Sequence, residues 1–179
     1  MTQVQKLIQL ISESRNQYLK TVALFSEKEA QAKPNPEVWN VVENTEHLFW
    51  AEQGGLLGMW KILDALRNGD ASSQNYEALL DSLSVEEIIA KTWKEKEIVP
   101  PVAAPRLGGT IAFWAASLHS LQSVLEKLGN ELSDNDLQLL THPHPISGIL
   151  NFHQRLEFLR FHIDRHHEQI KRIGFKEKN

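Results

Sequence analysis

Apolar residues recur at three- and four-residue steps along several stretches of the chain, which is the pattern of a helix that buries one face. The first stretch runs from Thr2 to about Phe25 and contains apolar residues at Val4, Leu7, Ile8, Leu10, Ile11, Tyr18, Val22 and Ala23. The chain has no sustained period-two alternation and no hairpin dipeptide between β-branched runs. The pattern therefore predicts helices and no strands.

Capping residues and chain breakers predict where the next helices begin and end. Ser26 and Glu29 have capping-box spacing and predict a short helical turn before the break at 34–36. Asn40 and Glu43 have the same spacing, so we expect a second long helix from Asn40 to about Leu66.

Later capping signals predict three more helices. Ser84 opens a third helix that we expect to reach about Glu97, and Thr110 caps a fourth over residues 111–128, with Gly129 at the C′ position. Residues 133–136 suggest a single further turn.

Ser147 is expected to cap the last helix, after the extended His-Pro-His-Pro segment 142–145. It should run to about Arg172, with Gly174 beyond its end. Four long amphipathic segments with short extra helical turns in their connections predict an all-α four-helix bundle. A chain of 179 residues fits one such domain, 1–179. In bundles, metal and ligand sites lie in the core between facing helices.

Composition and charge exclude several classes of function. A formal charge of −4 and a pI near 6.1 provide no basic surface, which argues against a nucleic-acid partner. No stretch approaches the roughly 18 apolar residues of a membrane span, and the start of the chain lacks the features of a signal peptide. We therefore expect a cytoplasmic protein without a membrane partner. The chain has no cysteine, so nitrogen and oxygen atoms must hold any metal.

Two of the eight histidines stand one helical turn apart near the end of the chain. His162 and His166 lie ~40° apart on one helical face, at the edge of the apolar stripe, so both should point into the bundle. Two buried imidazoles are hard to satisfy with apolar neighbours unless a divalent metal joins them. The alternative is a half-exposed or water-satisfied pair, because two ligands are too few for a metal site.

His47 is the best candidate for a third ligand, because it lies within the second long helix beside small residues. Gly54, Gly55 and Gly58 each cost a helix interior roughly 1 kcal/mol relative to alanine, which suggests close helix packing or room for a ligand. Alternatively, His47 is a core histidine that hydrogen-bonds a backbone carbonyl or another side chain.

The remaining histidines are weaker candidates. His167 should face away from the pair and be solvated or cap the helix. His142 and His144 lie in a proline-rich loop, where histidines are more often at the surface. His119 and His153 have no partner at ligand spacing.

Glu43 lies one turn before His47, and it can orient that imidazole by accepting its second N–H. The simpler role for this carboxylate is the capping box with Asn40.

Two segments of the sequence resemble the DinB-like (DinB/YfiT) superfamily. Residues 39–48, WNVVENTEHL, are similar to that family's W-S-x-x-E-x-x-x-H-L segment, with Asn40 where serine is usual. Residues 158–170, FLRFHIDRHHEQI, are similar to its closing H-x-x-x-H motif. The resemblance runs from about Thr2 to Ile173. It implies a four-helix bundle in which His47, His162 and His166 bind a divalent metal, commonly nickel or zinc, with solvent completing the coordination.

The resemblance also implies the kinds of activity to expect. Three histidines with open coordination positions are typical of a catalytic rather than a structural metal site. Members of this family resemble metal-dependent hydrolases, and relatives transfer low-molecular-weight thiols such as bacillithiol or mycothiol to electrophiles. We expect a metal-dependent enzyme with a small-molecule substrate, and family analogy favours a homodimer. The competing hypothesis is a non-catalytic, stress-related binding protein.

Overall fold

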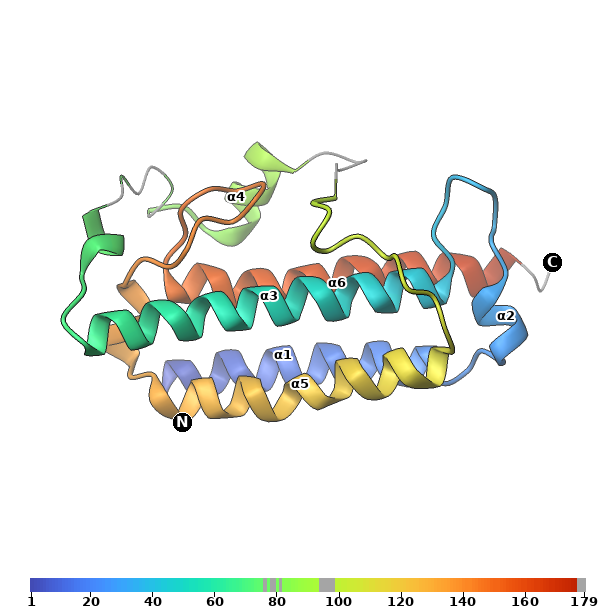
Figure 1. Ribbon diagram of the computed structural model, residues 1–179, viewed down its shortest axis with the longest axis horizontal. Helices are drawn as coiled ribbons and strands as arrows, with labels where there is room; N and C mark the ends of the chain where they lie inside the picture. The colour runs from blue at the N-terminus through green and yellow to red at the C-terminus, as the bar shows by residue number, and fades with distance from the viewer. Residues whose placement is uncertain (76, 78–79, 81, 94–98, 177–179) are drawn as a thin grey trace.

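The computed structural model describes residues 1–75, 77, 80, 82–93 and 99–176 (Figure 1). Over these residues the chain forms six α-helices and no β-strand, which confirms the predicted all-α class. The α-helices and two 3-10 turns are α1 (Gln3–Val22), α2 (Glu27–Gln31), α3 (Val41–Arg67), η1 (Ser72–Asn75), α4 (Val85–Thr92), α5 (Ile111–Glu131), η2 (Asp134–Gln138) and α6 (Phe152–Lys176).

The four long helices form the predicted bundle, in which α3 lies beside α6 in one layer and α1 lies beside α5 in the other (Figure 1). Each long helix packs on two others, because α1 and α3 both contact α5 and α6. Helices α3 and α5 run in the same direction, opposite to α1 and α6 (Figure 1). The connection from α3 to α5 must therefore return along the bundle, and it carries α4 over the α3–α6 layer.

The capping boxes read from the sequence are present. Asn40 accepts the backbone N–H of Glu43 at 2.8 Å, and the Glu43 carboxylate accepts the backbone N–H of Asn40 at 2.9 Å. The Ser26 and Ser84 boxes form in the same way. Each box satisfies backbone donors that a helix N-terminus would otherwise leave unpaired, which fixes where α2, α3 and α4 begin.

Two glycines expected at or beyond helix ends lie inside helices instead. Helix α5 continues through Gly129 to Glu131, and α6 continues through Gly174. A Cβ at Gly129 would lie 2.6 Å from Ile8 of α1, and one at Gly174 would lie 3.0 Å from Phe25. Both glycines therefore permit close packing rather than end a helix.

The last helix begins four residues later than predicted, because its capping residue is Asn151 and not Ser147. Asn151 forms the capping interaction with Gln154, whereas Ser147 lies in a turn in which its backbone N–H donates to His144. Gly148 has a φ of +73°, a left-handed conformation that helical residues do not adopt. The turn therefore keeps residues 147–148 out of α6.

Helix α4 ends at Thr92, whereas the sequence predicted a helix to about Glu97. Residues 94–98 lie outside the described part of the chain. Trp93 is extended, and its indole packs against Phe158, with ring centroids 5.0 Å apart. The indole N–H also donates to Ser147 at 3.3 Å. These contacts to α6 and its preceding loop compete with continuation of the helix.

The bundle core is mainly apolar, and it contains a buried ion pair. Arg15 of α1 donates to Glu52 of α3 and to Gln122 of α5, and both members of the pair are about fully buried. Such a pair contributes little net stability but is costly to break, because either charge alone would be buried without a partner. None of the helices in the described part of the chain is long and apolar enough to cross a membrane.

Candidate metal centre

The structure brings together the three histidines selected from the sequence. His47 comes from the second turn of α3, and His162 and His166 come from consecutive turns of α6. The Nε2 atom of His162 lies 3.1 Å from Nε2 of His47 and 3.1 Å from Nε2 of His166. The ligand atoms of the three side chains all lie within 4.8 Å of one another, close enough to hold one metal ion.

Hydrogen bonds behind two of the imidazoles, His47 and His166, fix which nitrogen of these rings is unprotonated. Nδ1 of His47 lies 2.8 Å from the backbone carbonyl of Ala103, which can only accept, so Nδ1 carries the proton. Nδ1 of His166 lies 2.8 Å from Oδ1 of Asn44. The Asn44 amide is held in this orientation because its NH₂ group donates to the carbonyls of Trp39 and Asn40. Both neutral rings therefore present an unprotonated Nε2 to His162.

This arrangement fits a divalent metal better than hydrogen bonding alone. A neutral His162 has one N–H, so it can satisfy the Nε2 lone pair of His47 or of His166 but not both. Burial lowers the pKa of all three histidines, and the neighbouring imidazoles lower those of His162 and His166 further. Three neutral nitrogen donors, two of them with the second nitrogen held by a hydrogen bond, are a ligand set that suits zinc and nickel.

A cavity of about 800 Å³ lies beside the three imidazoles. Its described walls come from α3, α6 and three connecting segments, which contribute residues 34–39, residues 93 and 99–103, and residues 142–146. Among the described residues, α1 and α5 contribute nothing to it. The site was expected in the bundle core, between facing helices. The cavity lies instead between the α3–α6 layer and the connections that line it. These connections lie on the side of α3 and α6 that faces away from α1 and α5 (Figure 1).

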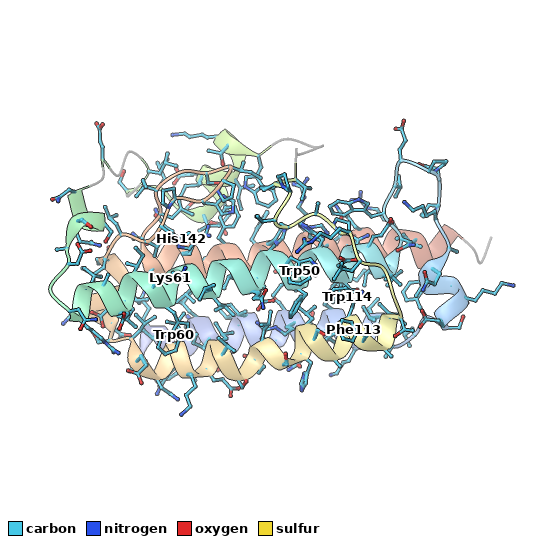
Figure 2. The ribbon with its side chains drawn as sticks, viewed as in Figure 1. Trp50, Trp60, Lys61, Phe113, Trp114 and His142 are labelled. Atoms are coloured by element: carbon cyan, nitrogen blue, oxygen red, sulfur yellow. The ribbon has the colours of Figure 1, made fainter. Side chains whose placement is uncertain are left out.

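The two loop histidines, expected at the surface, are half-buried and line this cavity. His142 lies on the side of α3 that faces the connections, whereas Trp60 and Trp114 lie toward α5 (Figure 2). Nε2 of His142 is 2.7 Å from Nη2 of Arg155. His144 packs on Phe158, with ring centroids 4.3 Å apart. The sequence did not indicate that these two histidines line a cavity, because their positions depend on the conformation of the loop.

The other histidines lie away from the three-histidine group. His167 faces α1, as its angle on the helix requires, but it is buried rather than solvated, and its Nε2 is 2.7 Å from Thr21. His119 is exposed on α5, and His153 pairs with Glu157 at 3.4 Å.

The three helical glycines near His47 have different surroundings. A Cβ at Gly58 would lie 2.2 Å from the His142 ring, and one at Gly55 would make ordinary contacts with Leu159 and Arg155. A Cβ at Gly54 would meet nothing within 4 Å. Gly58 therefore makes room for an imidazole of the cavity wall.

Two glutamates near His47 have roles other than binding its ring. Glu43, considered as the group that orients His47, is occupied by the Asn40 cap and by Lys33, whose Nζ is 2.8 Å away. The Ala103 carbonyl takes the position behind His47 instead.

Glu46, which sequence reasoning did not select, anchors the loop that carries Ala103. Its buried carboxylate accepts the backbone N–H groups of residues 106–108 at 2.8 to 3.0 Å and the indole N–H of Trp50 at 3.2 Å. Burial opposes ionisation, but these hydrogen bonds outweigh it and hold the pKa of Glu46 below its ordinary value.

The fold and the site together define an all-α bundle with a three-histidine group beside a large cavity. The family model of the DinB superfamily matches residues 10–170, and the chain belongs to this superfamily. Among solved structures, the crystal structure of a conserved protein from Enterococcus faecalis is similar, with a TM-score of 0.53 and 15% sequence identity. The match covers 97% of this chain and 95% of that one, and at this identity it shows the fold alone. Comparison with curated protein sequences gives no significant match.

Proposed function

We propose that the protein binds a divalent transition metal, nickel or zinc, through His47, His162 and His166, and that it is a metal-dependent hydrolase acting on a small molecule. The observation that carries the proposal is the pair of unprotonated Nε2 atoms directed at His162, each with its Nδ1–H fixed from behind. A bound metal would act as a Lewis acid at this position, lowering the pKa of a coordinated water or thiol.

The protein's own residues contribute orientation and a confined space. Asn44 and the Ala103 carbonyl hold two of the imidazoles in the ligating tautomer, and Glu46 holds the loop that supplies Ala103. The cavity has the volume of a small-molecule site, which is typically about 300–1,000 Å³.

The cavity volume also favours a second candidate, a thiol S-transferase. At about 800 Å³ it is large enough for a low-molecular-weight thiol and a small electrophile together. The chain has no cysteine, so the thiol would have to be a cosubstrate of the bacillithiol or mycothiol kind.

Metal binding is tested on protein purified without a histidine tag. We expect stoichiometric nickel or zinc by elemental analysis, and a rise in Tm of about 5–10 °C at a free metal concentration near 100 Kd. His162→Ala or His47→Ala should abolish stoichiometric binding, and His167→Ala, the neighbouring histidine that faces α1, should leave it intact. Equal losses in all three variants would mean that the ligands are assigned to the wrong face of α6. No binding by the wild type would leave a non-catalytic bundle as the better interpretation.

Activity assays separate the two enzyme classes. The metal-loaded protein is incubated with ester and amide panels, and separately with a thiol and an electrophile, beside His162→Ala as the metal-free control. Hydrolysis above the control supports the first candidate, and thiol consumption above the control supports the second. The expected homodimer is a separate question, which light scattering after size exclusion answers.

A further inference from the structure

Arg155 is a buried cation without a counter-ion. Its side chain lines the cavity and is 5% exposed. Among the described residues no carboxylate pairs with it, and only its Nη2 has a hydrogen-bond partner, Nε2 of His142 at 2.7 Å. The Nε–H is buried with no partner. A guanidinium in this state is costly, because its lost hydration is not replaced by an opposite charge.

His142 adds a second unused donor. A guanidinium can only donate, so Nε2 of His142 accepts from Arg155, and a neutral His142 carries its proton at Nδ1. This Nδ1 is also buried without a partner. Two unsatisfied N–H donors thus belong to adjacent side chains in the wall of one cavity.

The electrostatic surroundings of Arg155 also favour an anion. Arg155 lies in the first turn of α6, where the helix dipole already favours negative charge. The cavity is also lined by Arg165 and Arg172, and the only acidic side chain among its described lining residues is Glu37. The cavity is therefore cationic, although the whole chain has a formal charge of −4.

The cavity wall between Arg155 and His162 includes apolar side chains. Phe158 and Leu159 lie between these two residues on α6 and line the cavity, to which Trp50 and Val99 add further apolar surface. Arg155 and His162 are seven residues apart on α6, which is two helical turns or about 10 Å. A ligand with an apolar chain and an anionic end would match this wall, with the anion at Arg155 and the chain along the apolar side chains.

We infer that Arg155 and His142 bind the anionic end of a small carboxylate whose apolar body lies along Phe158 and Leu159. A planar two-oxygen anion of single charge suits one guanidinium with one neighbouring N–H donor. That this carboxylate is the substrate of the three-histidine centre rests on the function proposed above. Anion binding at Arg155 does not require the metal.

The test measures binding of hexanoate and of its neutral isostere hexanamide to the metal-free full chain by isothermal titration calorimetry. We expect hexanoate to bind at least tenfold more tightly than hexanamide, since a hydrogen bond between two charged groups is stronger than one to a neutral amide. Arg155→Met should remove this preference. Arg172→Met, which deletes an exposed cation of the same helix and cavity, should keep it.

A thermal melt of each ligand-free variant accompanies the titrations. Arg155→Met should be at least as stable as the wild type, because it removes an unpaired buried charge. Equal binding of hexanoate and hexanamide by the wild type would overturn the inference whether or not the variant folds. An undiminished hexanoate preference in folded Arg155→Met would also overturn it.

His162→Ala separates this inference from the proposed function. The variant should lose nickel binding and keep the preference for hexanoate. If the wild type prefers hexanoate but binds no nickel, the proposed function fails and the anion site stands. If it binds nickel but shows no preference for hexanoate, the anion site fails and the metal centre stands.

Discussion

Replacement of Gly58 by alanine tests how closely the loop histidine His142 packs on α3. A Cβ added at Gly58 would lie 2.2 to 2.5 Å from three atoms of the His142 ring, where ordinary contact begins at 3.4 Å. The nearest ring atom must therefore move by about 1.2 Å, the difference between 3.4 and 2.2 Å. Such a shift breaks the 2.7 Å hydrogen bond from Arg155 to His142.

The size of the effect follows from three contributions. Alanine stabilises a helix interior by about 1 kcal/mol relative to glycine. Overpacking costs about 1–3 kcal/mol, and loss of a hydrogen bond to a charged group costs about 1.5–3 kcal/mol. We expect Gly58→Ala to lower the free energy of unfolding by about 1.5–5 kcal/mol.

Gly54→Ala is the matched control, because its Cβ would meet nothing within 4 Å in the same helix. It should raise the free energy of unfolding by about 1 kcal/mol. Urea denaturation of the metal-free proteins, followed by circular dichroism, measures both values. His142→Ala combined with Gly58→Ala should recover most of the penalty, as a double-mutant cycle will show. Equal stabilities of the two single alanine variants would refute the proposed packing.

Three further predictions concern the hydrogen bonds of the site and its response to pH. Asn44→Leu removes the acceptor behind His166 and should weaken metal binding about 10–100-fold by calorimetry, whereas an unchanged Kd would mean that Asn44 does not position the ring. Glu46→Gln replaces a carboxylate that accepts three backbone N–H groups, and hydrogen exchange of residues 106–108 should become at least tenfold faster; unaltered protection would contradict this anchoring role. Burial, followed by the charge of Arg155, lowers the pKa of His142 to about 4. The unfolded chain therefore binds a proton at His142 that the folded chain does not, so metal-free stability should be full above about pH 6.5 and fall as the pH approaches 4. Midpoints of urea unfolding measured between pH 7.5 and 5 check this prediction, and a midpoint that does not change with pH would contradict it.

Much of the metal centre could be predicted because it depends on local helical geometry. The spacing of His162 and His166 fixes their common face once the segment is helical, and the Asn40 cap fixes where the helix of His47 begins. The family resemblance added what spacing cannot give, namely that α3 and α6 are neighbours.

The parts that sequence reasoning missed depend on backbone groups and loop conformation. The Ala103 carbonyl that orients His47 comes from 56 positions away, and a backbone carbonyl leaves no mark in the sequence. The pairing of His142 with Arg155 likewise requires a loop that folds back on α6. Gly129 was ambiguous for another reason, since glycine is favoured both after a helix end and where helices pack closely.

The parallel course of α3 and α5 has a consequence for how such a protein can diversify. Because the chain must travel back along the bundle between these helices (Figure 1), part of the cavity wall is made from a segment that the topology requires in any case. Trp93, Val99 and Ala103 of that segment face the cavity, while all three candidate ligands stand on the bundle helices beneath. Replacements in most of this segment can thus change which molecules enter the cavity, while the three histidines and the helical core stay unchanged.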